Sequence, residues 1–297
     1  IPLKFWFNRN IGMALPICAL QKNEIKMKIT YRNFSYLVNK SNGDNTNKIE
    51  FIEPTSDTIK LYADYIYLDT EEKRRFAQSS HEYLIEQVQM GGHEDLVYES
   101  NVKLNFSHPV KELIWVIRQK NVYTEGDSTA ATGTTVDATQ NNNLKIGSNL
   151  VGTTQKNDYF NYSLLPLTTG AEKVESLDLG NLYTNNYGEW FKGCKLQVNG
   201  ADRFSERNPY YFRTIQPTQS GHNIPSKHIY CYSFALNAED HQPSGTINYS
   251  RVESSKLVFN TLQGKGETTN SVFITVFAIY YNVLRIQGGI GGIAYSN

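Results

Sequence analysis

Cysteine is scarce in this sequence, and its pattern excludes two kinds of small, cross-linked fold. Only three cysteines occur, Cys18, Cys194 and Cys231, and they lie far apart with no CxxC spacing. An odd number of dispersed cysteines favours neither a disulfide framework nor a zinc-binding motif. We therefore predict free thiols, in a chain that folds in a reducing compartment.

The sequence also has no excess of charge of either sign. Lys plus Arg and Asp plus Glu number 29 each, so the formal net charge is +0. A protein that binds nucleic acid through its phosphates normally carries a net positive field, and this composition supplies none. We predict no direct contact with nucleic acid.

Long apolar runs and a leader-like start are missing as well. No stretch approaches the roughly 20 apolar residues that span a bilayer. The opening residues, IPLKFWFNRN, show no basic segment followed by an apolar one. We predict no direct membrane insertion. The opening lacks an initiator Met and is already apolar, so we expect the chain to be a piece of a longer polypeptide.

Aromatic and β-branched residues are abundant, with 20 Tyr and 14 Phe against 3 Met. Such residues favour the half-buried, pleated surface of strands. Because no strand–helix alternation accompanies the apolar runs, the pattern indicates an all-β sandwich or jelly roll rather than a parallel α/β sheet. The predicted strands are residues 23–34, 58–68, 81–90, 111–118, 194–200, 228–236, 255–262 and 271–286.

Two short segments have helical patterns. Residues 69–78, DTEEKRRFAQ, begin with Asp69 or Thr70 as a cap and place acidic residues before basic ones. Residues 200–207, GADRFSER, are the second predicted helix. The result is an all-β chain with isolated helical turns.

Polar stretches and a change of pattern indicate how the chain is organised. Residues 39–48 have the composition of a hairpin tip, and residues 121–162 are rich in Thr, Asn and Gly. A connection as long as 121–162 is unusual inside a compact domain, so we expect a surface loop. The helical pattern gives way to a strand before Gly91, and we place a domain boundary near residue 88.

The stretch ALNAEDHQPSGTINYSR brings Asp240, His241 and Ser244 within five residues, which are the residue types of a hydrolase. A relay requires the acid to orient the imidazole, but adjacent side chains on an extended backbone point to opposite faces. Pro243 and Gly245 mark the segment as a turn. We therefore predict a structural loop and no enzyme activity, with a hydrolase that uses this loop as an alternative.

Other candidate sites are weaker. The six histidines, at 81, 93, 108, 222, 228 and 241, lack metal-ligand spacing, which leaves only a site assembled from distant loops. We predict no metal and no cofactor. The segment RIQGGIGGIAYSN lacks the Lys-Ser/Thr ending of a phosphate loop, so a terminal strand is expected. Sequons for glycosylation stand at Asn33, Asn39, Asn105, Asn161 and Asn248.

The charged helix at 69–78 has two interpretations. One is a solvated helical face, and the other is a salt-bridge site between domains or subunits involving Asp69, Arg74 and Arg75. The planar guanidinium groups are suited to the second interpretation, because they bind carboxylates in a bidentate manner.

Six segments, in order along nearly the whole chain, resemble the major capsid proteins of the nucleocytoplasmic large DNA viruses, which include algal viruses, iridoviruses and giant viruses. The segments are IPLKFWFNRNIGMALPICALQ, LYADYIYLDTEEKRRFAQSSHEYLIEQ, SHPVKELIWVIR, CKLQVNGADRFSERNPYYFRTIQP, IYCYSFALNAEDHQPSGTINYSR and YYNVLRIQGGIGGIAYSN.

This resemblance implies a double jelly roll of two eight-stranded antiparallel sandwiches. Residues 1–88 would be the last strands of the first, and residues 89–297 the complete second. The partial first jelly roll would leave strand edges unpaired, so we expect residues 1–297 not to fold stably alone. The resemblance also makes the loop Asp240, His241, Gln242, Pro243, Ser244 and Gly245 a structural signature of the second jelly roll.

The resemblance implies a structural role. The protein would form a homotrimeric, pseudo-hexagonal capsomer that contacts neighbouring capsomers and minor capsid proteins in the icosahedral shell of the virion. Assembly would take place in the host cytoplasm, with an internal membrane beneath the shell. The alternative is a carbohydrate-binding jelly roll that uses surface aromatic residues such as Trp190, Tyr210 and Tyr211.

Overall fold

A computed structural model describes residues 2–30, 59–91, 94–95, 100–119, 160, 162, 189–261 and 272–295. Contacts divide the chain into two units. Unit 1 comprises Ile1–Phe34, Thr46–Gln87 and Tyr280–Asn297, and unit 2 comprises Ser35–Asn45 and Val88–Ile279. One division falls beside the boundary predicted near residue 88, while the C-terminal residues cluster with the N-terminal ones. The assignment of 1–88 and 89–297 to separate jelly rolls stays a prediction.

The chain is all-β, as predicted, and its described residues form two sheets. The larger sheet has seven strands in the order β1-β10-β4-β7, with β2 and β11 pairing with β10, and β8 pairing with β4. The smaller sheet has the order β3-β9-β5-β6. The strands are β1 (His81–Met90), β2 (Glu94–Asp95), β3 (Ser100–Lys103), β4 (Pro109–Gln119), β5 (Phe191–Val198), β6 (Ala201–Asp202), β7 (Ile229–Ser233), β8 (Ile247–Asn248), β9 (Ser255–Thr261), β10 (Val272–Gln287) and β11 (Ile290–Ile293).

Aromatic side chains form the core of unit 2. Trp115 of β4 lies 5.1 Å from Phe212 and 6.0 Å from Tyr230 of β7, measured between ring centroids. Phe191 of β5 lies 5.0 Å from Tyr230 and 5.1 Å from Phe259 of β9. All five side chains are fully buried. The cluster therefore joins side chains of both sheets. A core built from large aromatic side chains agrees with the aromatic-rich composition.

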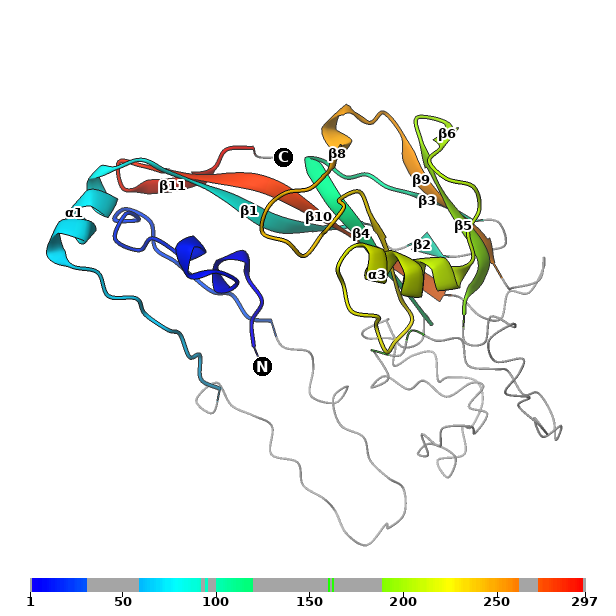
Figure 1. The fold of residues 1–297 in the computed structure, drawn as a ribbon, viewed down its shortest axis with the longest axis horizontal. Coiled ribbons are helices and arrows are strands. Elements are labelled where there is room, and N and C mark those ends of the chain that lie inside the picture. Colours follow the sequence, from blue (N-terminus) through cyan, green and yellow to red (C-terminus); the bar gives the residue numbers. More distant parts are fainter. Residues whose placement is uncertain are drawn as a thin grey trace, which may run out of the picture. The chain divides into compact units, whose positions relative to one another are not determined.

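Short helical segments complete unit 2. The π-helical turn η6 (Tyr211–Ile215) continues into α3 (Gln216–Gln219), and both contact β7. These segments can be followed in Figure 1 beside the strands of unit 2. A 3-10 turn, η7 (Tyr249–Arg251), follows β8 and is capped by Asn248. The sequence patterns predicted none of these turns.

The second predicted helix, residues 200–207, is wrong. Asn199 and Gly200 both have positive φ, at 49° and 82°, and Val198 pairs with Ala201 across them. Two consecutive residues with positive φ match the two-residue turn that suits the twist of a hairpin. The Asn-Gly pair therefore starts the β5–β6 hairpin, and this turn chemistry decided the local structure over helix propensity.

Unit 1 confirms the first predicted helix, α1 (Thr70–Gln78). Asp69 is its N-cap, accepting from the Thr70 amide at 2.6 Å, while the Glu72 side chain accepts from the Asp69 amide at 3.4 Å. This reciprocal capping is encoded locally, because all of the groups lie within one turn. The helix ends at Ser79, whose backbone is extended.

Two predicted strands of unit 1 are wrong for the part that the structure describes. Residues 23–30 and 59–68 form no strand, and apolar side chains along them are exposed: Ile25, Met27, Ile29, Ile59, Leu61, Tyr62, Tyr65, Ile66 and Tyr67. The alternating pattern indicates which side chains share a face, but a strand also needs a neighbouring backbone for its hydrogen bonds.

The other six predicted strands correspond to β1, β4, β5, β7, β9 and β10. The glycine-rich C-terminal segment is also a strand, as expected, because β10 turns at Gly288 and Gly289 and pairs with β11. N-terminal 3-10 turns, η1 (Trp6–Asn8) and η2 (Ile11–Met13), belong to unit 1. Among the described helices, none is long and apolar enough to cross a bilayer.

Candidate functional site

The loop at residues 235–245 holds the signature residues, and its own side chains close it. The Ser244 hydroxyl accepts from the Asn237 amide and donates to the Asn237 carbonyl, each at 3.0 Å. The Asn237 side-chain amide donates to an Asp240 carboxylate oxygen at 2.6 Å. The two polar residues that suggested chemistry, Asp240 and Ser244, therefore bind the same residue of their own loop.

Buried groups tie this loop to the rest of unit 2. Lys111 of β4 is 1% exposed, and its Nζ donates to the Ala238 carbonyl at 2.7 Å. The Ala238 amide donates to the Ser220 carbonyl at 2.9 Å, and the Phe234 amide donates to the Lys111 carbonyl at 2.8 Å. Since a buried Lys must have its charge and donors satisfied, these contacts make the loop part of the packed structure.

A glycine adjoining the loop is expected to be intolerant of substitution. Gly221 has a φ of 84°, and a Cβ there would lie 2.0 Å from Oδ1 of Asn237. We expect Gly221→Ala to destabilise unit 2 by about 2–3 kcal/mol, because it combines a left-handed backbone with displacement of the loop side chain. Thermal unfolding of the variant measures this loss.

The matched control for that substitution is Gly200→Ala. Gly200 has nearly the same φ, 82°, with no atom within 4 Å of its added Cβ. It should therefore lose only the backbone contribution, about 1 kcal/mol. Equal losses for the two variants would show that the contact between Gly221 and Asn237 contributes nothing.

His222 follows this glycine and contacts two carboxylates. Its Nε2 lies 2.6 Å from Glu112 Oε2, and its Nδ1 lies 3.0 Å from Glu239 Oε1. Glu112 belongs to β4 and is 1% exposed, whereas Glu239 belongs to the loop and is 48% exposed. The ligand-type atoms of the three residues lie within 4.8 Å of one another. The spacing of the histidines in the sequence did not predict this cluster. The one sign of it in the sequence was the charged pair Lys111-Glu112 inside an otherwise apolar predicted strand.

A second buried acid lies at the edge of the aromatic core. Glu189 is 3% exposed and accepts hydrogen bonds from Arg213 Nε at 2.9 Å and from the Tyr230 hydroxyl. His228 Nε2 lies 3.7 Å from Glu189 Oε1. Burial, followed by the charge of Glu189, holds the pKa of Tyr230 well above its ordinary value. The tyrosine is therefore a neutral hydrogen-bond donor, and this cluster was also missed because its members come from distant segments.

The hydrolase alternative has no supporting geometry. No hydrogen bond joins Asp240, His241 and Ser244 to one another, all three of which the structure describes. His241, Gln242 and Pro243 are exposed. A base must lie within hydrogen-bond reach of its nucleophile, and here the hydroxyl binds backbone instead.

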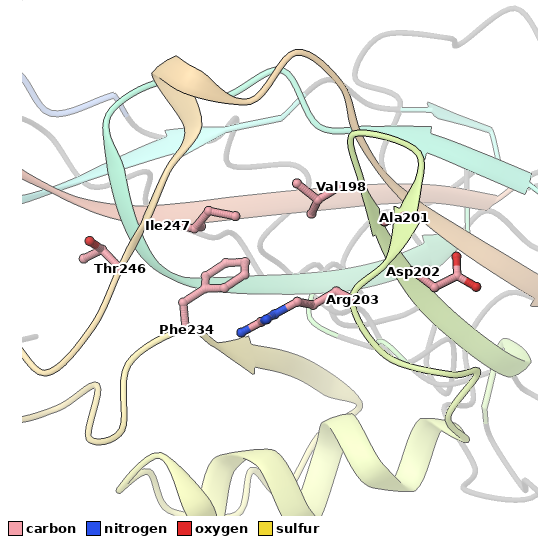
Figure 2. A pocket seen from close by; sticks show the side chains of 7 residues that line it. All are labelled: Val198, Ala201, Asp202, Arg203, Phe234, Thr246 and Ile247. Carbon is pink, nitrogen blue, oxygen red and sulfur yellow. The ribbon is translucent and has the colours of Figure 1, made fainter.

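A hollow of about 460 Å³ lies where the β5–β6 hairpin approaches the two ends of the loop. Figure 2 shows Phe234 and Ile247 on one side and the side chain of Arg203 reaching toward Phe234. Asp202, also on the lining, accepts from Lys195 Nζ at 3.0 Å and from Gln197 Nε2 at 2.6 Å. The hollow is open. One aromatic ring and no pair of acidic groups line it, so its side chains do not form a catalytic arrangement.

The surface aromatics of the carbohydrate-binding alternative are not all at the surface. Trp190 is 3% exposed, and its Nε1 donates to the Tyr162 carbonyl at 2.8 Å. Tyr211 is half-buried and its hydroxyl accepts from Gln216, whereas Tyr210 is exposed. The prediction that Trp190 is accessible is wrong, because its ring is buried and its one donor is satisfied by a carbonyl.

The predicted interface residues lie on α1. Arg74 pairs with Glu71 of the same helix at 2.5 Å, and both are well exposed. Arg75 is exposed in the last turn, and Asp69 caps the helix. An exposed ion pair within one helix contributes little to stability, so it is easily exchanged for another partner. The two guanidinium groups are therefore accessible to another carboxylate. Their role at an interface stays a prediction.

The predicted glycosylation sites fall into two groups. Asn105 and Asn248 are exposed, and the Asn248 side chain accepts from the Ser250 amide at 3.1 Å. Asn33, Asn39 and Asn161 lie outside the described residues, as does the predicted loop at 121–162 except for Phe160 and Tyr162. The sequons stay predictions.

Comparison with known proteins gives consistent matches. A model for large eukaryotic DNA virus major capsid proteins matches residues 72–292, and one for the major capsid protein N-terminus matches residues 1–69. Major capsid proteins of Phaeocystis pouchetii virus and Pyramimonas orientalis virus are each 37% identical over 100% of this chain. The chain spans 65% and 61% of their lengths, less than two thirds of each.

A solved structure agrees with these matches. A quasi-atomic model of the PBCV-1 virus capsid superposes with a TM-score of 0.62 at 29% identity, covering 100% of this chain and 70% of that one. The structural neighbours have double jelly-roll folds, so the predicted fold class is confirmed. The matched family is one of structural capsid proteins and not of enzymes. With a match over residues 72–292, the chain belongs to the family of large eukaryotic DNA virus major capsid proteins.

Proposed function

We propose that this protein forms homotrimeric, pseudo-hexagonal capsomers that tile the icosahedral shell of a large double-stranded DNA virus. The observation that carries the proposal is the family match over residues 72–292. Neighbouring capsomers and minor capsid proteins are the proposed partners, and the virion shell, assembled in the host cytoplasm, is the proposed location. Nucleic acid and membrane are not proposed as direct contacts.

Two physical features support assembly. Apolar side chains are exposed along residues 23–30 and 59–68, and Tyr62 and Tyr67 are 86% and 87% exposed. Such surface is stabilised when the rest of the polypeptide or a neighbouring subunit covers it, and stable interfaces between subunits commonly bury more than about 2,000 Å². The net charge of +0 also means that copies do not strongly repel one another.

The native mass of the complete natural polypeptide tests the proposal. We expect light scattering to give three times the mass of one chain, and negative-stain images of the same fraction to show a hexagonal outline. A monodisperse monomer that never assembles would contradict the proposal. Glycan binding by that monomer would favour the carbohydrate-binding alternative.

We further propose that Arg74 and Arg75 pair with carboxylates of another domain or subunit. The double variant Arg74→Ala/Arg75→Ala should weaken trimer or particle formation by on the order of tenfold or more, since truncating one side of a desolvated charge pair is costly. Sedimentation at several concentrations measures this change.

Lys73→Ala is the matched control, because Lys73 is an exposed base of the same helix. It should leave assembly unchanged. Normal trimers and particles from the double arginine variant would contradict the proposed pairing, whatever the control does.

A further inference from the structure

His222 stands between two carboxylates in a way that a neutral imidazole cannot satisfy. A neutral ring carries one N–H, so one ring nitrogen would direct a lone pair at a carboxylate oxygen. Here Nε2 is 2.6 Å from Glu112 and Nδ1 is 3.0 Å from Glu239. Both contacts are hydrogen bonds only when both ring nitrogens carry a proton. We propose that His222 is an imidazolium that fastens the 235–245 loop to β4, and that this link opens as the pH rises.

The charges around the ring favour this protonated state. Glu112 and Lys111 face it from β4, and Glu239 faces it from the loop. Cys231 of β7 borders the same site, where burial, then Glu112, raises the pKa of its thiol to about 12, so it is uncharged. With His222 protonated, two positive groups balance two carboxylates. Loss of the proton would leave an unbalanced negative charge in a partly buried site.

The same geometry argues against a bound metal. The two carboxylates lie against different nitrogens of the ring, each at hydrogen-bond distance. Zinc would need a bond of about 2.0–2.1 Å to one ring nitrogen, and both carboxylates would have to bind the ion beside that nitrogen. The observed arrangement instead gives each N–H of an imidazolium its own acceptor.

The sign of the pH dependence follows from the pKa of His222. Its hydrogen bond to Glu112 raises that pKa above 6.5, helped by the charges of Glu112 and Glu239 and opposed by burial and Lys111. A raised pKa in the folded state means that the link contributes fully below about pH 6.5. Its contribution is lost as the pH rises through the raised value.

Opening of the link should be local. The Lys111–Ala238 and Ser220–Ala238 hydrogen bonds remain when His222 loses its proton. The part of the loop that depends on Glu239 includes exposed surface, such as His241 and Gln242. Above the transition, the protein would therefore keep its fold and present this surface differently to whatever it contacts.

Hydrogen exchange of the 235–245 loop tests the proposal in the complete natural polypeptide. Exchange is measured from pH 5.5 to 9 and divided by that of an unstructured peptide of the same sequence. The Asn237 amide reports directly, because it donates to the Ser244 hydroxyl inside the loop, and the Ala238 amide, which donates to the Ser220 carbonyl, is an internal control that should keep its protection. We expect the protection of the Asn237 amide to fall about tenfold as the pH rises, since losing one charge-assisted hydrogen bond corresponds to on the order of a factor of ten.

Three variants make the test specific. His222→Gln should lose protection already at pH 6 and show no transition, and Glu239→Gln should move the transition to lower pH. His241→Gln, in the exposed part of the same loop, should behave as the wild type. Loop protection that is independent of pH in the wild type would overturn the proposal. An unchanged transition in Glu239→Gln would also overturn the proposal. This second result can be obtained even if His222→Gln does not fold.

Added zinc ions distinguish a protonated link from a metal site. Added Zn²⁺ should not change exchange of the loop if an imidazolium forms the link. Protection that rises with Zn²⁺ in the wild type and not in His222→Gln would show that the cluster takes a metal, and the protonated link would then be wrong.

Discussion

Replacing Trp115 with alanine should lower the free energy of unfolding by about 3–5 kcal/mol, the largest loss expected for one substitution in unit 2. Trp115 is fully buried and lies between Phe212 at 5.1 Å and Tyr230 at 6.0 Å. Its removal takes away the burial of a large apolar surface and leaves a cavity that the flanking rings cannot fill without moving. Denaturant unfolding of the complete polypeptide measures the change.

Leu236→Ala is the control for this prediction. Leu236 is 82% exposed, so its truncation should change stability by less than about 0.5 kcal/mol. A loss below about 1 kcal/mol for the Trp115 variant would show that the aromatic cluster does not hold the two sheets together.

Replacing Arg213 with methionine should cost about 2–4 kcal/mol, because the buried carboxylate of Glu189 loses its charged partner. The Arg213 Nε–Glu189 distance is 2.9 Å, and the carboxylate side is 3% exposed. His228 at 3.7 Å is too distant to replace this bond. Removing one partner of a buried pair leaves an uncompensated charge, although the 26% exposure of Arg213 reduces the loss. Thermal and denaturant unfolding both report it.

A surface ion pair supplies the comparison. Lys195 and Asp202 are separated by 3.0 Å but are 29% and 43% exposed, so Lys195→Ala should cost no more than about 1 kcal/mol. Arg213→Lys, which keeps the charge, should recover part of the loss seen with methionine. Equal effects for Arg213→Met and Lys195→Ala would mean that burial of Glu189 does not matter.

The sequence predicted those parts of the fold whose information is local. The capping residues of α1 all lie within one turn, so Asp69 and Glu72 could be read from their spacing alone. Six strands followed from apolar and β-branched runs, because side-chain alternation is a property of the strand itself. The order of six family-like segments predicted the family that the comparisons then showed.

Turn chemistry and strand pairing were less predictable. Residues 200–207 include helix-forming side chains, but Asn199 and Gly200 form a hairpin turn that pairs Ala201 and Asp202 with β5. Residues 23–30 and 59–68 alternate as strands do and yet form none. A pattern of side chains does not specify whether another backbone is present to complete its hydrogen bonds.

By itself, the sequence determined the all-β class, helix α1, most strands and the family, because propensity, capping and motif order depend on neighbours along the chain. Only the tertiary structure decided that Ser244 closes a loop, that Trp190 is buried and that His222 stands between Glu112 and Glu239. Glu112 and His222 are 110 residues apart. Their contact depends on how β4 packs beneath the loop, and packing between distant segments leaves no spacing to read in the sequence.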